Sequence, residues 1–565
     1  MKIELKEIIA GAILSCYRNL IGNEECRIPE HISVDFDVPK NRDHGDLTTN
    51  FAMKYASSAK KSPIELSRMI CDCVASSGIE GLKKIEPAGP GFINVFLEHE
   101  VFYNVVLEVL DKREKYAVSD TCRGKKVIIE FVSANPTGPL TVAHGRQAAV
   151  GDALARLLAN SGCEVFREYY LNDRGRQIDI LGKSLYSKYM KLCGREYPFP
   201  DDGYKGSYID DLAKKLYSEK GAEFSGISEK TVEFMCDYAK NNILEWIKKD
   251  LADFSVEFNS YFSEKKFSET GKVEEAIKLL EKKGLVYEKD GAIWFNSRKY
   301  GDDKDRVMVK SSGEWTYITP DIAYHKDKLD RGFDLLIDLW GPDHHGYIPR
   351  MKAAVQAMGF NAGCLKVVII QLATLYQGKN KLSMSTRQGE FISLREVMNE
   401  VGVDAARYFF LMLNTDSHLD FDLELAKKRS AENPVYYIQY THARICSMLE
   451  KYNEKFGHDY IPVVQPGILE ELTNREEKDL IKKISVFPSA AELAASLLEP
   501  HRIHVYLTEL ASLFHSYYHK DSKKFRVIGE KEDNITLARM ALVSAVKIII
   551  ASGLGLLGIT APEKM

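Results

Sequence analysis

A strand–loop–helix–strand pattern begins at residue 127 and limits the folds open to this chain. Residues 127–132, Val-Ile-Ile-Glu-Phe-Val, are mostly apolar and β-branched, which is typical of a buried strand. A loop rich in proline and glycine follows at 135–139, residues 143–160 show helical periodicity, and residues 164–171 give a second strand. This order predicts a βαβ unit, and therefore a parallel sheet that binds its ligand at the carboxyl ends of its strands.

The rest of the chain divides around this unit. Its 565 residues suggest three to four domains at roughly 150 residues each. Residues 335–340 and 367–372 are predicted to add strands to the sheet, and the helix-rich, charged stretch at about 183–300 is predicted to be an insertion. Residues 1–115 open with an amphipathic helix and include a strand at 91–97, so they are predicted to form an α+β domain.

The C-terminal block, residues 426–565, is predicted to be almost wholly helical. The pair Asn433-Pro434 is typical of a helix start, with a capping side chain followed by proline in the first turn. Lys547 interrupts the longest apolar stretch, and the run 548–559 is shorter than the roughly 20 residues that a membrane span needs. The sequence therefore predicts no membrane segment.

Composition excludes several classes of protein. Hydrophobic residues make up 45% and charged residues 28%, which indicates a globular protein and not a disordered or collagen-like one. The net charge of −4 does not by itself indicate a nucleic-acid-binding protein, although a protein with this net charge can still carry a local basic face. The cysteines are scattered, and the single close pair, Cys71 and Cys73, lacks a second pair to complete a zinc site. We therefore expect reduced thiols in a cytoplasmic protein and no structural metal.

Two loops could hold a phosphate chain. The first places His144 at the start of the predicted helix, where free backbone N–H groups and the helix dipole attract anions. The second, residues 379–389, is basic and could close over a polyphosphate. A helix-start histidine without a ligand and a solvated surface loop are the respective alternatives.

Other candidate residues lie near predicted strands and on predicted helices. Asp343, His344 and His345 follow the strand 335–340 and could bind a metal or a substrate. Tyr317 and Asp321 are four residues apart, so a helical turn would bring them to one face, where the aspartate could pair with a guanidinium. An ordinary helix-start aspartate is equally compatible with that spacing.

Tyr437, Tyr440 and Arg444 share one face of a predicted helix in the C-terminal block. Two aromatic rings and an arginine on one face can stack on unpaired bases. The alternative is an aromatic stripe that packs into the helical core.

Together these segments closely resemble arginyl-tRNA synthetases, which are class I aminoacyl-tRNA synthetases, and the resemblance runs from end to end. The first class I motif, usually written HIGH, is Thr141-Val142-Ala143-His144 here, and its flanks 133–140 and Gly145-Arg146 are similar to the bacterial arginyl form. Further matching segments are 44–46, 88–94, 168–173, 177–179, 321–325, 343–347, 416–422 and 433–444.

The resemblance implies an α/β fold with a Rossmann-type parallel-sheet catalytic domain at 116–425. It also implies that residues 1–115 contact the tRNA elbow and that residues 426–565 bind the anticodon. The implied reaction activates L-arginine with ATP and Mg²⁺ to arginyl-adenylate and transfers the arginyl group to the 3′ end of tRNA(Arg). Members of this family typically require bound tRNA for activation. We also expect a monomer that binds no membrane.

The resemblance assigns residues to each substrate. Those implied for catalysis are His144, Lys381 and Arg387. Those implied for ATP are Ala134, Asn135, Pro136, Thr137, Gly138, Pro139, Leu140, Thr141, Val142, Ala143, His144, Gly341, Asp343, His345, Ser383, Met384 and Ser385. Those implied for arginine are Glu130, Ser133, Asn135, Tyr317, Asp321 and His344. Those implied for tRNA are Tyr437, Tyr440, Arg444 and Met565, and none is implied for a metal.

Two motifs depart from the family pattern. In the first motif, Thr141 replaces a histidine and Ala143 replaces a glycine. In the second motif, usually KMSKS, one alignment puts Ser383 and Thr386 in both lysine positions, and a shifted alignment recovers Lys381 alone. The loop cation is therefore Lys379, Lys381 or Arg387. A catalytically impaired tRNA-binding paralogue and another class I synthetase or nucleotidyltransferase are the competing hypotheses.

Overall fold

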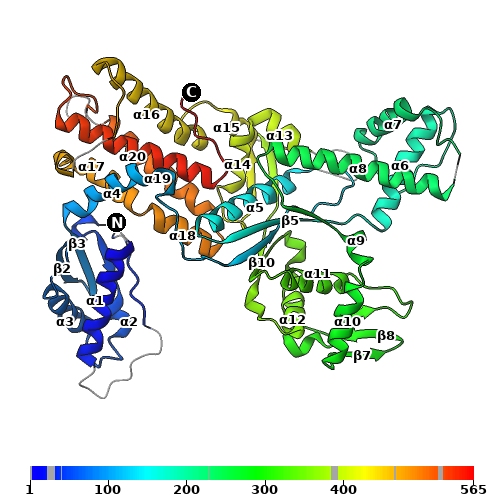
Figure 1. The fold of residues 1–565 in the computed structure, drawn as a ribbon, viewed down its shortest axis with the longest axis horizontal. Coiled ribbons are helices and arrows are strands. Elements are labelled where there is room, and N and C mark those ends of the chain that lie inside the picture. Colours follow the sequence, from blue (N-terminus) through cyan, green and yellow to red (C-terminus); the bar gives the residue numbers. More distant parts are fainter. Residues whose placement is uncertain are drawn as a thin grey trace.

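The computed structural model describes residues 3–21, 32–37, 39, 41–226, 228–378, 380–382, 392–462, 466–519 and 526–565. A sheet domain lies at the centre of the molecule (Figure 1). The N-terminal domain and the C-terminal helices lie together on one side of it, and a helical arm projects on the other side.

The central sheet has five strands, and every neighbouring pair is parallel. The chain passes from β4 to β5 on one side and later adds β10 on the other side, so the strand order reverses beside β4. Sheets of this kind bind ligands at the carboxyl ends of the strands beside such a reversal. From edge to edge the strands are β11 (Leu365–Ile369), β10 (Leu335–Trp340), β4 (Lys126–Glu130), β5 (Glu164–Leu171) and β6 (Ser260–Ser263).

Helices cover both faces of this sheet (Figure 1). Val127 and Ile129 of β4 join one hydrophobic core, whereas Ile128 between them joins a second core on the opposite face. Because both faces are covered, the strand is apolar at consecutive positions, as the sequence predicted. The covering helices are α5 (Val142–Asn160) in the first core and α11 (Ile318–Asp330) and α12 (Ile348–Met358) in the second.

The stretch predicted as one insertion consists of two segments separated by a strand of the central sheet. The first segment is the helical arm, the strand is β6, which pairs with β5, and the second segment follows β6. The strand β6 is Ser-Tyr-Phe-Ser, which is too short and too polar to stand out in the sequence. The elements are α6 (Arg176–Leu192), α7 (Ser207–Lys220) and α8 (Glu229–Asp253) before β6, then α9 (Glu264–Ser268), α10 (Lys272–Lys282), β7 (Val286–Lys289), β8 (Ala292–Phe295) and β9 (Arg306–Val309).

The sheet domain is completed by a second small sheet and three helices. The strand β12 runs parallel to β14 and antiparallel to β13. The elements are β12 (Ala373–Gln377), β13 (Asn380–Lys381), α13 (Leu394–Val401), α14 (Val403–Leu411), β14 (Leu419–Asp422) and α15 (Leu423–Lys427).

The α+β N-terminal domain and the helical C-terminal domain agree with the predicted fold class. Asn433 accepts a hydrogen bond from the backbone N–H of Val435, 3.3 Å away, and so caps α16 as predicted. The N-terminal elements are α1 (Ile3–Ile21), β1 (Leu47–Thr49), α2 (Phe51–Tyr55), α3 (Pro63–Ala75), β2 (Leu82–Ala88), β3 (Phe92–Leu97) and α4 (His99–Lys112). The C-terminal helices are α16 (Pro434–Phe456), α17 (Arg475–Ser485), α18 (Phe487–Leu497), α19 (His501–His519) and α20 (Asn534–Leu556).

The N-terminal and C-terminal domains are in direct contact. Asp46 accepts the backbone N–H of Leu97 at 2.8 Å and forms an ion pair with Lys482 of α17. Asp46 belongs to the segment 44–46 that resembles the family's N-terminal domain. In this structure its carboxylate joins the two domains.

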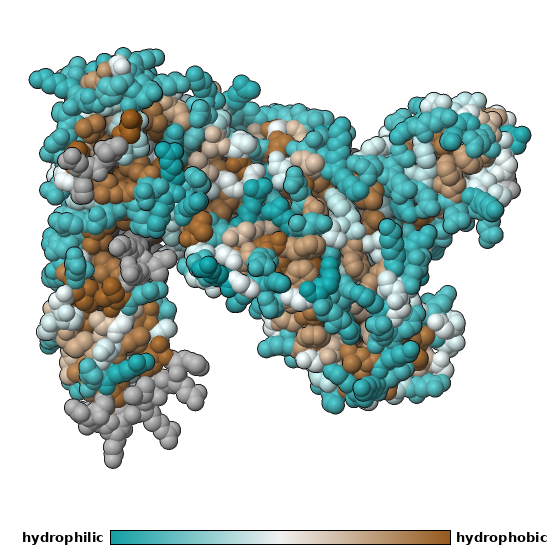
Figure 2. All heavy atoms as spheres, viewed as in Figure 1, coloured by the Kyte–Doolittle hydropathy of each residue, from teal (hydrophilic) through white to brown (hydrophobic). Residues whose placement is uncertain are grey.

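One helix of the described chain, α20, is long and apolar enough to cross a membrane by length and composition. Two thirds of its most apolar window is buried inside the protein. On the face shown in Figure 2, the upper edge of the C-terminal helices is mostly hydrophilic. The burial of α20 is that of a core helix of the C-terminal domain.

The expectation that all cysteines are reduced thiols is wrong for one pair. Cys16 of α1 and Cys73 of α3 form a disulfide. The two residues are 57 positions apart, so the spacing of Cys71 and Cys73 in the sequence gave no sign of this pairing.

Candidate functional site

The chain turns sharply where β4 ends. The backbone φ angles are +66° at Val132 and +40° at Ser133, a region that β-branched residues rarely adopt. The Ser133 hydroxyl donates to a Glu130 carboxylate oxygen at 3.1 Å, and it accepts the backbone N–H of Tyr170 at 3.1 Å. The turn therefore brings Ser133 back against Glu130, at the carboxyl ends of β4 and β5.

His144 lies in the first turn of α5. The backbone N–H of Thr141 donates to Nδ1 of His144 over 3.1 Å, so Nδ1 carries no proton and the ring proton is on Nε2. Burial lowers the pKa of His144 to about 4, which makes the ring neutral at neutral pH. The first turn of α5 thus holds a neutral Nε2–H donor at the positive end of the helix dipole, which suits an anionic ligand.

The other residues predicted for ATP in the first loop, 134–143, form the connection from β4 into α5. Asn135 donates to the side-chain oxygen of Gln177 at 2.7 Å. The hydroxyls of Tyr169 and Tyr208 donate to the backbone oxygens of Ala134 and Thr137, each at 2.7 Å. These contacts fix the loop against β5 and the helical arm.

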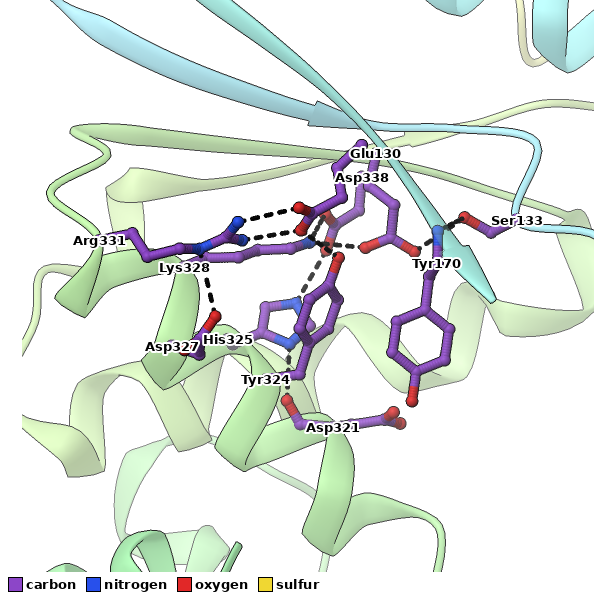
Figure 3. A network of polar contacts seen from close by, with 11 residues as sticks. Glu130, Ser133, Tyr170, Asp321, Tyr324, His325, Asp327, Lys328, Arg331 and Asp338 are labelled. Atoms are coloured by element: carbon purple, nitrogen blue, oxygen red, sulfur yellow. Dashed lines mark hydrogen bonds and ion pairs between the residues drawn. The ribbon is translucent and has the colours of Figure 1, made fainter. Parts of the chain in front are cut away.

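Asp321 lies in the first turn of α11, and its carboxylate accepts a hydrogen bond of 2.6 Å from the Tyr347 hydroxyl. Burial raises the pKa of Asp321. Burial raises the pKa of Glu264, the residue directly after β6; the positive charge of Arg174 opposes this effect and the charge on Asp321 adds to it. The Tyr170 hydroxyl points toward the Asp321 carboxylate (Figure 3). Two half-buried acidic side chains therefore lie near one another at the carboxyl end of the sheet.

Tyr317, predicted to share a helical face with Asp321, directs its side chain to solvent and is 89% exposed. The helix α11 begins at Ile318, so Tyr317 precedes the first turn. Within this structure, Tyr347 and not Tyr317 holds the Asp321 carboxylate.

A buried polar network connects Glu130 with α11 (Figure 3). Lys328 donates to Glu130 at 2.6 Å and to Asp338 at 2.8 Å. His325 lies 2.8 Å from Asp338 through Nε2 and 2.8 Å from the backbone oxygen of Asp321 through Nδ1. The side chains of Lys328 and Asp338 have no exposed surface, so this network is part of the interior beneath the site.

Asp343, His344 and His345 lie on a 3₁₀ helix, Pro342–Tyr347, directly after β10. All three side chains are exposed, and His344 is 3.4 Å from Asp343. Gly341 starts this turn. Across the part of the chain that the structure describes, no group of three or more His, Cys, Asp or Glu side chains could hold a metal ion.

The second predicted phosphate loop is described in part. Lys381 is exposed on β13, beside the carboxyl end of the sheet domain's small strand β12. Four further residues proposed for this loop lie outside the described residues, as does Lys379: Ser383, Met384, Ser385 and Arg387.

The C-terminal domain contains an open pocket of about 810 Å³. Arg444 donates to the hydroxyls of Tyr440 at 2.6 Å and Tyr518 at 2.9 Å. Tyr437 instead stacks on His515, with ring centroids 4.5 Å apart. The lining combines aromatic and basic side chains with the last residue of the sequence, and it includes Tyr440, Arg444, Lys451, Lys455, Tyr518, Arg526 and Met565.

Sequence reasoning missed Glu264 and Tyr347 as individual site residues. Glu264 could have been found if β6 had been recognised, because residues that follow strands of a parallel sheet meet at its ligand-binding edge. Tyr347 lies in the segment 343–347 that carries the family resemblance, but no spacing rule relates it to Asp321.

Three family models match consecutive parts of the chain. Residues 4–97 match the arginyl tRNA synthetase N terminal domain. Residues 105–445 match the class I (R) tRNA synthetase catalytic domain, and residues 438–565 match the DALR anticodon binding domain.

Two relatives of similar length are both named arginine–tRNA ligase. An arginine–tRNA ligase from Desulfosudis oleivorans is 49% identical over 534 residues, which is 94% of this chain and 95% of that protein. An arginine–tRNA ligase from Bacillus subtilis is 44% identical over 569 residues and covers 100% of this chain and 99% of its own. The arginyl-tRNA synthetase structure from Thermus thermophilus has the same fold, with a TM-score of 0.77 at 20% identity over 99% of this chain and 100% of that one.

Proposed function

The chain belongs to the arginyl-tRNA synthetase family and is an arginine–tRNA ligase, and from that premise we propose which of its residues bind arginine, ATP and tRNA. The reaction activates L-arginine with ATP and transfers the arginyl group to the 3′ end of tRNA(Arg). The observation that carries the assignment of arginine is the pair of half-buried, desolvated carboxylates, Asp321 and Glu264.

We propose that Asp321 and Glu264 bind the guanidinium group. Desolvation raises the pKa of each carboxyl, and the charge on Asp321 adds to the raise at Glu264, against the opposing charge of Arg174. A bound guanidinium would relieve that repulsion, and its planar N–H groups suit carboxylate partners. Tyr347 orients Asp321. Tyr317 is a candidate to fold over the bound side chain, because it is exposed at the entrance to α11.

Glu130, Ser133 and Asn135 are proposed for the opposite end of arginine. Glu130 offers a carboxylate to the α-ammonium group, and Ser133 and Asn135 offer polar groups at the end of β4. His344 is proposed to approach the same end from the 3₁₀ helix after β10. The sheet would thus hold arginine between the carboxyl ends of β4 and β6.

ATP is proposed to bind over the loop 134–143, the first turn of α5, Gly341, Asp343 and His345. An arginine carboxylate oxygen attacks the α-phosphorus, and the bond from that phosphorus to the leaving pyrophosphate oxygen breaks. His144 can donate from Nε2 to the phosphate oxygens as charge accumulates on them. Mg²⁺ is proposed to arrive with ATP as part of the substrate. Lys381 and Arg387 are proposed to offset the pyrophosphate charge.

The aromatic and basic pocket of the C-terminal domain is proposed to bind the anticodon. Tyr440 and Tyr518 offer ring faces, and Arg444, Lys451 and Arg526 offer positive charge. Met565 lines the same pocket. We also propose that Tyr437 contacts tRNA through the edge of its ring, that tRNA must be bound before arginine is activated, and that the enzyme is a cytoplasmic monomer.

Exchange of labelled pyrophosphate into ATP tests the proposal. With tRNA(Arg) present, arginine alone among the amino acids should support exchange, and lysine and citrulline should not. Omission of tRNA should abolish it. Exchange that proceeds equally with citrulline would refute the role of the two carboxylates, and absence of exchange with every amino acid would favour the catalytically impaired paralogue.

A further inference from the structure

His325 occupies an unusual position beneath the site. One ring nitrogen faces the backbone oxygen of Asp321 and the other faces the carboxylate of Asp338, each at 2.8 Å. Both partners are acceptors, so both nitrogens must donate, and the doubly protonated imidazolium is the form that satisfies them. Asp338 correspondingly raises the pKa of His325 against the effect of burial.

Lys328 makes the second connection. Its ammonium group bridges the carboxylates of Glu130 and Asp338, at 2.6 and 2.8 Å, without any exposed side-chain surface. With His325 protonated, two positive groups face two negative ones, so the network is neutral in total charge. Such a buried network is stable only while each charge keeps its partner.

The network joins the two ends of the proposed arginine pocket. Glu130 is on β4, and the backbone oxygen held by His325 belongs to Asp321 on α11 (Figure 3). Burial disfavours the ionised form of Glu130, and the charge on Lys328 opposes that effect. The charged or titratable groups around Glu130 are Lys328, His325 and Tyr324 of α11, Asp338 of β10 and Tyr170 of β5.

We propose that Lys328 is a positioning residue whose direct ion pair keeps Glu130 ionised for the α-ammonium group of arginine. This rests on the role of Glu130 proposed above. Lys328 touches no substrate itself. It acts through Glu130, and the same network anchors the start of α11, so one buried unit sets both the charge at one end of the pocket and the backbone position at the other.

The test is the pH profile of the arginine KM in aminoacylation, measured from pH 6.5 to 8.5 at saturating ATP and tRNA(Arg). In Lys328→Met the buried Glu130 loses its counter-ion, so its pKa rises and it becomes protonated as pH falls. Below that new pKa, the arginine KM should increase by about tenfold per pH unit, whereas the parent enzyme should show little change. Lys328→Arg restores the charge and should restore the flat profile.

A matched variant separates this role from general support of the fold. Asp338→Asn breaks the same network but leaves Lys328 on Glu130, so it should lower the melting temperature while keeping the flat profile. A Lys328→Met enzyme whose arginine KM is unchanged, or is raised equally at every pH, would overturn the proposal. A sloping profile in Asp338→Asn equal to that of Lys328→Met would overturn it as well.

Two more variants guard against misfolding and identify which proposal fails. If Lys328→Met is insoluble, Glu130→Gln with Lys328→Met removes one charge of each sign and should recover soluble protein; failure to recover it would refute the pairing. Glu130→Gln alone should raise the arginine KM at every pH. If it does not, the proposed role of Glu130 is wrong, whereas a normal Lys328→Met profile beside an impaired Glu130→Gln enzyme refutes only the positioning role.

Discussion

Replacement of Asp321 by asparagine removes a charge and keeps the shape of the side chain. The carboxylate is held by the Tyr347 hydroxyl at 2.6 Å and is half-buried and desolvated, so bulk water only partly replaces its interaction with a guanidinium. Loss of one partner of a buried ion pair costs about 3–5 kcal/mol. The kcat/KM for arginine should therefore fall by roughly two to four orders of magnitude. Because Glu264 keeps a second carboxylate in the pocket, we expect the lower half of that range.

The assay is aminoacylation of tRNA(Arg) with varied arginine, at saturating ATP and tRNA. Tyr347→Phe is the matched control, because it keeps the Asp321 charge and removes one hydrogen bond to it. A hydrogen bond to a charged group contributes about 1.5–3 kcal/mol, but this one is present both with and without arginine, so Tyr347→Phe should lower kcat/KM by clearly less than Asp321→Asn does. A folded Asp321→Asn enzyme with less than a tenfold loss would show that Asp321 is a structural helix-start aspartate.

The pH dependence of arginine binding tests the roles of Asp321 and Glu264 independently. Burial raises the pKa values of Asp321 and Glu264. As pH falls through these raised values, the carboxyls become protonated and no longer attract the guanidinium. The arginine KM of the parent enzyme should therefore rise at a higher pH than an ordinary carboxyl would produce, and Asp321→Asn should weaken this rise. An acid limb identical in the two enzymes would contradict the assignment.

Four other substitutions test the nucleotide and tRNA sites. His144→Ala should lower the single-turnover rate of arginyl-adenylate formation by roughly 10²–10³ with little change in arginine affinity, and the reverse pattern would make His144 a binding residue. Lys381→Ala should slow pyrophosphate exchange at saturating tRNA without weakening tRNA binding; equal activity would move the role to another cation. Tyr440→Ala should raise the KM for tRNA by roughly 10- to 100-fold, and Arg444→Ala should in addition flatten its salt dependence. Filter binding at several salt concentrations distinguishes these results from an aromatic stripe that only packs in the core.

The elements around the proposed ATP site could be predicted because their signals are local. An apolar run flanked by polar loops predicted β4, and helical periodicity predicted α5 with a start one residue from the observed one. The Asn433 cap was predicted from two adjacent residues. In each case the residues that determine the structure are neighbours in the sequence.

The arginine pocket could be predicted only in part, because its residues meet through the tertiary fold. Lys328 and Glu130 are 198 positions apart, and no periodicity relates them. Glu264 follows a strand too short to recognise. Tyr317 has helical backbone angles at the N-cap of α11 but turns its side chain to solvent, and the spacing of Tyr317 and Asp321 could not show that Tyr347 holds the carboxylate.

The turn at Val132 and Ser133 shows why local preference alone could not place Glu130. A β-branched residue at positive φ costs on the order of 1–3 kcal/mol, so the surrounding contacts must hold it there. Two of them are the hydrogen bonds of the Ser133 hydroxyl to Glu130 and from the Tyr170 backbone. An extended strand would direct Glu130 and Ser133, three positions apart, to opposite faces of the sheet. The strained turn instead places both beside the carboxyl end of β5. There Lys328 contacts Glu130 from the protein interior, and we propose that arginine contacts it from the solvent side.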